Sequence, residues 1–325
     1  MKNTLLALAG LTLAAALAEA IILVRIHLDP LRLAALMGSL ALLLGALVAL
    51  TQEDFIERLR QWAYDSWFLA VLMPFTLLIP YLILAYGTDT FSRLALVKLA
   101  AYIAVPTFLL FPNRTYCAER ASWRDFAALA SLAVPVGAGW LRGIWIWPAD
   151  LYIFPPIYCV CVAAYAFLVV RSLKDAGYKL IFTTGDLTEG TINFIAFILL
   201  AIPIGLALHF IHPQVRPVSV FAVIAKFVGV YLAVAIPEEF LFRGILQNLL
   251  VKTFDYPHNG LKGLLAASVI FGLSYLRFPP VPNWKFAIMA TVAGIFYGNA
   301  WRIQKRTSSS AFTHALVDTV WRFWF

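Results

Sequence analysis

Long apolar runs separated by short polar segments make up most of the chain. Each run is about 20 residues long, the length a helix needs to cross the roughly 30 Å hydrocarbon core of a bilayer. The polar segments carry Pro and Gly, and none is long enough to form a soluble domain. We therefore expect an all-α, polytopic transmembrane helical bundle. The pattern predicts about eleven spans, at residues 4–24, 32–50, 66–86, 93–111, 126–146, 151–170, 191–210, 218–250, 260–277, 284–302 and 309–325.

Three of these runs have special features. The run 218–250 is too long for a simple crossing and contains Pro237, which predicts a kink or a partly interfacial helix. The run 4–24 could pass for a signal peptide, but it continues beyond the small-residue site at 16–18, so we expect a retained span. In the run 284–302, Gly294 and Gly298 are spaced as a small-xxx-small face, which predicts close helix packing.

Composition agrees with a membrane protein. Of the 325 residues, 62% are hydrophobic and only 13% are charged, and the mean hydropathy is +0.84. Soluble globular proteins are roughly half apolar and about a quarter charged. These values exclude an ordinary soluble enzyme, a disordered chain and a DNA-binding domain.

The net charge of +8 comes from 25 Lys and Arg against 17 Asp and Glu. Placing Lys2 in the cytoplasm puts 14 of the basic residues on the cytoplasmic side and eight on the other, and three fall within apolar segments. This distribution follows the positive-inside rule and predicts a cytoplasmic N-terminus. The positive charge therefore does not require a nucleic-acid partner.

The cysteines point to packing rather than to chemistry. The three cysteines, Cys117, Cys159 and Cys161, cannot form a complete set of disulfides and do not have zinc-site spacing. Cys159 and Cys161 lie inside an apolar run, where packing is the better interpretation. No metalloprotease helix, phosphate loop or dinucleotide fingerprint occurs, so we expect no cofactor.

Ionisable residues inside apolar segments carry the functional information. Each costs about 2.5–3.5 kcal/mol to insert at the centre of a membrane helix. Glu239 and Arg243 stand four apart with the acid first, which is the favoured order for a helical ion pair. Glu238 points about 100° away and is left without that partner. We expect Glu239 to stay ionised and Glu238 to be a candidate general base for water.

A depth argument connects Glu238 to the following span. From Glu238 to Val251 the helix rises about 20 Å, and from Leu261 to Tyr275 it rises about 21 Å. If residues 252–260 turn the chain as a helical hairpin, Glu238 and Tyr275 reach nearly the same level in the membrane.

The last span carries His314 and Asp318, which are four apart and therefore on one helix face. Asp318 can fix the imidazole tautomer, and the imidazole can then hydrogen-bond an oxyanion or a water. With the span limits given above, helical rise places His314 roughly 10 Å nearer the cytoplasm than Glu238. Either those limits are wrong or the helix ends are not flush. The alternative for all these groups is a buried polar network that holds helices together, but their number in the last third of the chain favours function.

In order and spacing, these residues resemble the CPBP family, which comprises the CAAX prenyl endopeptidases and the bacteriocin-processing or self-immunity membrane proteins, also called Abi proteins. The resemblance rests on Glu-Glu-x-x-x-Arg at 238–243, Phe-x-x-x-Tyr at 271–275 and His-x-x-x-Asp at 314–318. It covers 238–325 directly. We expect the family's core to occupy 186–325, with 1–185 forming N-terminal transmembrane helices of unassigned role.

The resemblance implies an intramembrane glutamic protease. Glu238 would activate water together with the second-motif residue, Arg243 would order the acidic pair through Glu239, and His314 with Asp318 would stabilise the oxyanion. The implied partners are membrane lipids and a hydrophobic, prenylated or otherwise lipidated peptide, cut in CAAX-type, bacteriocin-leader or C-terminal sorting-tail processing. The implied location is the bacterial cytoplasmic membrane. Oligomeric state is left open.

One departure from the family pattern matters, because Tyr275 stands where the family has histidine. A phenol donates a hydrogen bond but does not share a proton with a glutamate near neutral pH. Three alternatives follow. Tyr275 only positions water, or another group takes over the role of the missing histidine. In the third, hydrolysis has been lost and a binding or immunity role remains. A zinc site is disfavoured, because few ligands are left without that histidine. A transporter is a further alternative, suggested by the buried charges.

Overall fold

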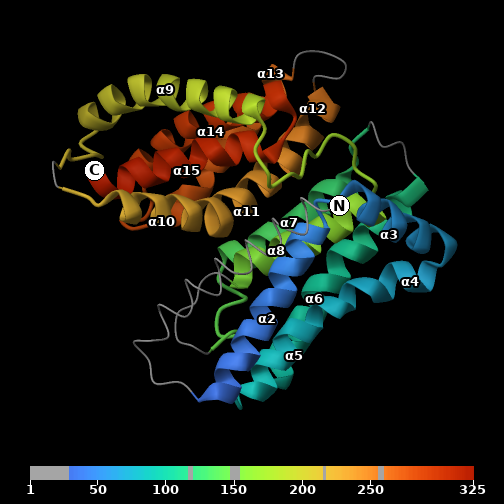
Figure 1. Ribbon diagram of the computed structural model, residues 1–325. Coiled ribbons are helices and arrows are strands. Elements are labelled where there is room, and N and C mark those ends of the chain that lie inside the picture. Colours follow the sequence, from blue (N-terminus) through green and yellow to red (C-terminus); the bar gives the residue numbers. More distant parts are fainter. Residues whose placement is uncertain (1–28, 116–119, 147–153, 215–216, 255–259) are drawn as a thin grey trace. The chain divides into compact units, whose positions relative to one another are not determined.

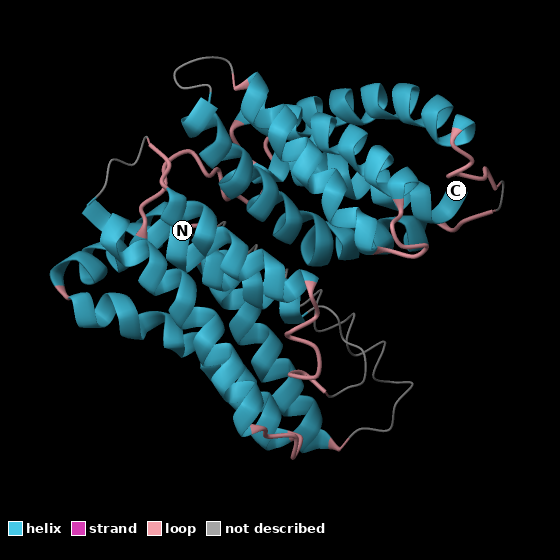
Figure 2. Cartoon of the chain, turned by 180° about the vertical axis from the view of Figure 1, so that it is seen from behind, coloured by secondary structure: helices cyan, strands magenta, loops and turns pink. Residues whose placement is uncertain are grey.

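The structure is a computed structural model that describes residues 29–115, 120–146, 154–214, 217–254 and 260–325. Within these ranges the chain forms helices and no strand, as Figure 2 shows, so the predicted all-α class is confirmed. The chain divides into two compact units, Met1–Tyr116 with Ala130–Ser172, and Cys117–Leu129 with Leu173–Phe325. The predicted first span 4–24 and Cys117 lie outside the described residues. The predicted division at residue 185 concerns the extent of the family's core and stays a prediction.

Among the described residues, five helical segments are long and apolar enough to cross a membrane. They are Pro30–Ala49, Trp67–Gly87, Arg93–Asn113, Thr184–Ala207 and Val220–Phe254. Each coincides with a span predicted from the sequence. The remaining predicted spans in the described ranges coincide with helices that are shorter or less apolar. The protein is an integral membrane protein.

The first unit is a helical bundle built around α2, and Figure 1 shows α2 beside α5. Asp29 caps α2 by accepting a hydrogen bond from the backbone N–H of Leu31 at 3.2 Å, and Pro30 occupies the first turn. Cys159 and Cys161 are buried and free, as the packing interpretation predicted. The elements of this unit are α2 (Pro30–Ala49), α3 (Glu53–Asp65), α4 (Trp67–Leu72), η1 (Met73–Leu77), α5 (Leu78–Gly87), α6 (Arg93–Leu110), η2 (Phe111–Thr115), α8 (Phe154–Ala164) and η3 (Tyr165–Val170).

The second unit contains every motif residue. Helix α7 (Trp123–Gly137) contributes residues to both units. The later elements are α9 (Thr184–Ala207), α10 (Val220–Val230), η4 (Tyr231–Ala235), α11 (Ile236–Glu239), η5 (Phe240–Gln247), α12 (Asn248–Phe254), α13 (Leu261–Leu273), η6 (Ser274–Arg277), α14 (Trp284–Gln304) and α15 (Thr307–Trp324). Helix α14 packs against α9, α13 and α15, and α10 with η4 covers another side of α15 (Figure 1).

The segment Val220–Phe254 is helical throughout, but its geometry changes around Pro237. Tyr231–Ala235 and Phe240–Gln247 are π-helical, and the short α11 between them carries both motif glutamates. Proline has no backbone N–H to donate and crowds the preceding turn. Wider turns on either side accommodate it, and such π segments occur often at functional sites.

Close contact between α13 and α14 depends on glycine. A Cβ added at Gly294 would lie 3.1 Å from the Cα atom of Ser268 in α13. The small-xxx-small face predicted at Gly294 is therefore a site of close helix packing.

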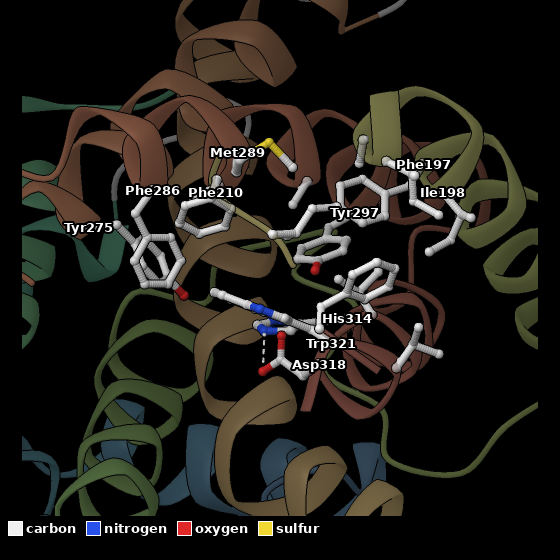
Figure 3. Close-up of a pocket in the computed structure, with 18 of the residues that line it drawn as sticks. Phe197, Ile198, Phe210, Tyr275, Phe286, Met289, Tyr297, His314, Asp318 and Trp321 are labelled. Carbon is white, nitrogen blue, oxygen red and sulfur yellow. Dashed lines mark ion pairs between the residues drawn. The ribbon is translucent and has the colours of Figure 1, made fainter. Parts of the chain in front are cut away.

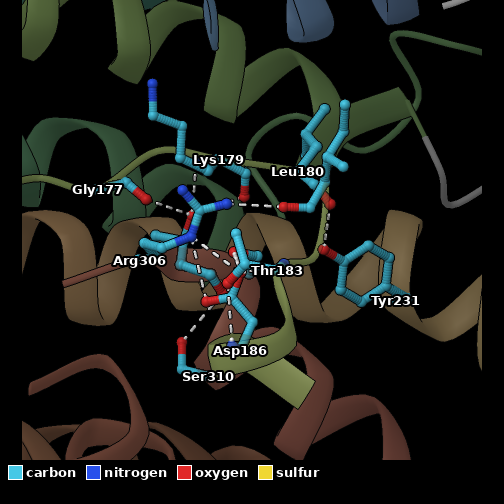
Figure 4. A network of polar contacts seen from close by, with 11 residues as sticks. Gly177, Lys179, Leu180, Thr183, Asp186, Tyr231, Arg306 and Ser310 are labelled. Carbon is cyan, nitrogen blue, oxygen red and sulfur yellow. Dashed lines mark hydrogen bonds and ion pairs between the residues drawn. The ribbon is translucent and has the colours of Figure 1, made fainter. Parts of the chain in front are cut away.

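A buried carboxylate ties the start of α9 to the start of α15, as Figure 4 shows. Asp186 is fully buried, and its Oδ2 atom lies 2.9 Å from Nε of Arg306. Thr183 and Asp186 form a reciprocal capping box at the first turn of α9. Ser308 donates to the same Oδ2 atom at 3.0 Å. These contacts fix the depth at which α15 enters the unit.

Candidate functional site

Glu239 is the centre of the buried motif residues. Its Oε2 atom accepts a hydrogen bond from Nε of Arg243 at 2.9 Å, and its Oε1 atom lies 2.9 Å from Nδ1 of His314. Glu239 and Arg243 are fully buried, and His314 is 2% exposed. The helical ion pair predicted from the four-residue spacing is present. A buried pair with such geometry holds each partner in one orientation.

The predicted depth of His314 is wrong. Counting residues from the expected span ends placed it roughly 10 Å from the level of Glu238, whereas its ring touches the adjacent Glu239. The reason is the position of α15, which begins at Thr307 with its first turns inside the protein. Ser308, Ser309 and Ser310 are all 0% exposed. These small side chains let the start of the helix pack deeply among its neighbours.

Glu238 has a different environment from Glu239. The Oη atom of Tyr275 donates a hydrogen bond to Oε2 of Glu238 at 3.1 Å. Both side chains are half-buried rather than sealed from solvent. No cation among the described residues forms an ion pair with Glu238. The hairpin argument thus placed the two residues correctly, and the two neighbouring glutamates divide into one paired and one unpaired carboxylate.

Asp318 approaches the second nitrogen of the imidazole. Its Oδ2 atom lies 3.5 Å from Nε2 of His314, and 31% of its side chain is exposed. Protonated imidazole satisfies both neighbours, because each ring N–H then donates to a carboxylate oxygen. The contact to Asp318 is longer and more exposed than the contact to Glu239. The N–H group at Nε2 is therefore the one that can exchange Asp318 for another hydrogen-bond acceptor.

Two aromatic rings hold the histidine in place, one from the second motif and one that no motif specifies. The ring of Tyr297 stacks on His314 with centroids 4.6 Å apart and planes 13° apart. Phe271 contacts the same imidazole edge-on, with centroids 6.2 Å apart. The guanidinium carbon of Arg243 lies 4.9 Å from the centroid of Phe271, which is a cation–π distance. Phe271 therefore links the Arg243 side of the site to the His314 side.

An apolar cavity of about 120 Å³ adjoins these residues. Figure 3 shows Tyr275, Tyr297, His314 and Asp318 along its wall, and the other labelled residues around it are mainly aromatic and aliphatic. Helices α9, α13, α14 and α15 all contribute to the lining. A mostly apolar cavity with a few converging polar groups is the usual form of a small-molecule or peptide-side-chain site.

The six residues singled out in the sequence fall into two connected groups. Glu238 joins Tyr275, while Glu239 joins Arg243, His314 and, through the imidazole, Asp318. Among the described residues, no three His, Cys, Asp or Glu side chains gather in a way that could hold a metal ion. Tyr297 was missed in the sequence, because it resembles any other buried aromatic residue of its helix.

Comparison with known proteins supports the resemblance seen in the motifs. Residues 220–320 match the family model described as Type II CAAX prenyl endopeptidase Rce1-like. This match spans all six motif residues and confirms the similarity to the CPBP family. No curated protein matches the chain, and no solved structure matches it.

The fold and the site together define a class. The protein is a helical membrane protein whose residues 220–320 are similar to the type II CAAX prenyl endopeptidase Rce1-like family.

Proposed function

We propose that the protein is an intramembrane endopeptidase in which Glu238 activates a water molecule for attack on a peptide bond. The observation that carries the proposal is the contrast between the two neighbouring carboxylates. Glu239 is committed to Arg243 and His314, whereas the hydrogen bond from Tyr275 is the only one that the Glu238 side chain makes within the described part of the chain. An accessible, unpaired carboxylate beside a fixed histidine is the arrangement that general-base hydrolysis requires.

The first step uses Glu238 and Tyr275. Glu238 accepts a proton from water as the water oxygen forms a bond to the substrate's carbonyl carbon. The Tyr275 hydroxyl holds one oxygen of Glu238, which leaves the other oxygen to face the water. Holding the base and the water in the right orientation lowers the entropic part of the activation barrier.

The second step uses His314. Negative charge that develops on the carbonyl oxygen accepts a hydrogen bond from Nε2–H, while Glu239 holds Nδ1 in place. The proton on Glu238 then passes to the amide nitrogen as the carbon–nitrogen bond breaks. One water is consumed, and the products are a new carboxyl terminus and a new amine.

The apolar cavity and the family match support the proposed substrate class. A hydrophobic or lipidated peptide, including a prenylated one, fits a cavity lined mainly by aromatic and aliphatic side chains. CAAX-type, bacteriocin-leader and C-terminal sorting-tail processing are all compatible with it. The resemblance to the CPBP family supports placing the protein in the bacterial cytoplasmic membrane. The distribution of basic loop residues supports a cytoplasmic N-terminus.

The test is cleavage by purified protein reconstituted in lipid vesicles, with a panel of farnesylated and unmodified apolar peptides and mass spectrometry of the products. Wild type is expected to generate a new carboxyl terminus, and Glu238→Gln is expected to generate none while keeping the wild-type Tm. Cleavage is also expected to persist in a strong chelator. Unchanged cleavage by Glu238→Gln would reject the assignment of the base.

Tyr275 supports a second candidate, a non-catalytic relative that binds a peptide or lipid in an immunity role. In this case the phenol replaces the imidazole that completes the catalytic set of the family. The substitution Tyr275→His distinguishes the two candidates. Proteolysis gained only in the variant would establish the binding role, whereas robust proteolysis by wild type would exclude it.

A further inference from the structure

The hydroxyl group of Tyr297 has no part in the reaction proposed above. Tyr297 lies on α14, is 2% exposed and contributes to the wall of the apolar cavity. Its ring stacks on His314, but its hydroxyl forms no hydrogen bond with another residue that the structure describes. Buried tyrosine hydroxyls usually have a partner; that of Tyr231, for example, donates to the backbone carbonyl of Leu180 at 2.6 Å. The Tyr297 hydroxyl is therefore a donor that is still available.

This hydroxyl is open to the cavity. The hydroxyl of Tyr158 in the first unit is also without a partner, but it is sealed among side chains, whereas that of Tyr297 is not. Figure 3 shows the Tyr297 hydroxyl on the side of the cavity where His314 and Asp318 lie. The rest of the lining is mainly aromatic and aliphatic and offers few acceptors. The acceptor for this hydroxyl is thus a molecule that enters the cavity.

The Tyr297 hydroxyl lies between the two connected groups of motif residues. It is close enough to Asp318 and to Glu238 to interact electrostatically with both. The hydroxyl of Tyr275, which holds Glu238, is a further electrostatic neighbour. A peptide carbonyl that is attacked by water from Glu238 and turns its oxygen toward His314 therefore lies beside Tyr297.

A phenol hydroxyl suits the charge that develops at this position. It keeps its proton at neutral pH, so it donates a hydrogen bond and brings no net charge into the membrane. The carbonyl oxygen becomes negative when water attacks, and a donor aimed at it stabilises the transition state more than the substrate. Oxyanion sites of hydrolases commonly combine two donors, whereas the mechanism above uses only the Nε2–H group of His314.

Building on the proposed function, we infer that Tyr297 is a further catalytic residue, whose hydroxyl donates a hydrogen bond to the substrate's carbonyl oxygen beside the Nε2–H group of His314. The stacking of the two rings, with planes 13° apart, fixes one donor relative to the other. Tyr297 keeps its proton throughout. Its hydrogen bond strengthens as the oxygen becomes an anion and weakens when the carbonyl forms again.

The experiment measures the binding of a transition-state analogue, so it does not depend on turnover. Full-length protein carrying Glu238→Gln is placed in nanodiscs of phosphatidylcholine. It is titrated with an N-terminally labelled apolar peptide and with analogues that carry a phosphinic group in place of each peptide bond in turn. The tetrahedral, negatively charged phosphinic group mimics the oxyanion. Fluorescence anisotropy gives Kd for each ligand.

The test variant is Tyr297→Phe, which keeps the ring that stacks on His314 and removes only the hydroxyl. The matched control is Tyr231→Phe, which removes a phenol hydroxyl of the same unit outside the cavity. Both changes are made in the protein that carries Glu238→Gln.

In the parent protein we expect the tightest phosphinic analogue to bind about 1,000-fold more tightly than the ordinary peptide. Tyr297→Phe should reduce this preference about 100-fold, the usual effect of losing one oxyanion donor. Its Kd for the ordinary peptide should stay unchanged, which shows that the variant is folded. Tyr231→Phe should keep the full preference.

Three results overturn the inference. A full preference in Tyr297→Phe leaves ring stacking as the only role of Tyr297. An equal loss of affinity for both kinds of ligand shows that the hydroxyl serves the fold or the bound substrate. Equal affinity for both in the parent protein shows that the site does not favour a tetrahedral anion.

The two proposals can fail separately. If Glu238→Gln still cleaves peptide but the phosphinic preference depends on Tyr297, the assignment of the base fails and the second donor stands. If Glu238→Gln is inactive but Tyr297→Phe keeps the full preference, the base stands and the role of Tyr297 fails.

Discussion

Glu239 and His314 meet at 2.9 Å although 75 positions separate them in the chain. The contact joins the first and third motifs through a carboxylate that does not itself face the substrate. Glu239 also accepts from Arg243, so one fully buried side chain holds both a cation and the imidazole. In this account Glu239 is a positioning residue and Glu238 is the base.

Replacing Glu239 should affect stability as well as activity. Glu239→Gln leaves Arg243 buried without its counter-charge, which costs about 3–5 kcal/mol in comparable buried pairs. We expect a large fall in Tm, measured in detergent, together with loss of peptide cleavage.

The double variant Glu239→Gln/Arg243→Met separates the two effects. Removing both charges should restore much of the Tm, because the unpaired cation is gone. Cleavage should stay lost, because His314 is no longer held by a carboxylate. A double variant that regains cleavage would show that Glu239 serves stability alone.

The hydroxyl of Tyr275 should matter to catalysis and little to folding. Tyr275→Phe keeps the ring contacts with Phe271 and Phe286 and removes only the donor to Glu238. We expect kcat to fall about 10- to 100-fold, in the range typical of a positioned polar group in a proton-transfer step. KM and Tm should stay near their wild-type values. A wild-type kcat for the variant contradicts the positioning role.

A side chain at Gly294 should destabilise the protein. Gly294→Ala places a Cβ 3.1 Å from the Cα atom of Ser268, so α13 and α14 must move apart by a few tenths of an ångström. Overpacking of this kind costs about 1–3 kcal/mol, and Tm should fall accordingly. Gly229→Ala is the matched control, since nothing lies within 4 Å of a Cβ at that position. Equal Tm values for the two variants would count against close packing at Gly294.

The contacts of Asp186 with Thr183, Arg306 and Ser308 should determine how deeply α15 packs in its unit. Asp186→Asn weakens the ion pair with Arg306 and the capping box with Thr183, so we expect a loss of about 3 kcal/mol. Tm and cleavage should fall together, because His314 lies two turns further along α15. Glu189→Gln, a change of the same kind on the same helix, should alter neither. A stable, fully active Asp186→Asn protein argues against the network's role.

Local spacing predicted the contacts that lie within one helix. The pairs Glu239–Arg243 and His314–Asp318 follow from four-residue separation, since helix geometry alone places such residues on one face. The Glu238–Tyr275 contact followed from equal helical rises on the two arms of a hairpin. Five of the predicted spans also coincide with helices long and apolar enough to cross a membrane.

Contacts between distant helices were not predictable in the same way. The depth of His314 depends on how far α15 enters the bundle, and that is set by the contacts of Asp186 with Arg306 and Ser308 rather than by hydropathy. The stacking of Tyr297 on His314 likewise needs the packing of α14 against α15. Hydropathy fixes which residues lie in the membrane but not the register between neighbouring helices.

The most direct test of the central claim follows the oxygen of water. A single turnover of the reconstituted protein is run in water enriched in oxygen-18, and mass spectrometry examines both the product and the Glu238 side chain. Direct attack by a Glu238-activated water predicts one labelled oxygen in the new carboxyl terminus and none in Glu238. Label in the Glu238 carboxylate together with an unlabelled product would contradict it, because that pattern requires a covalent bond between Glu238 and the substrate.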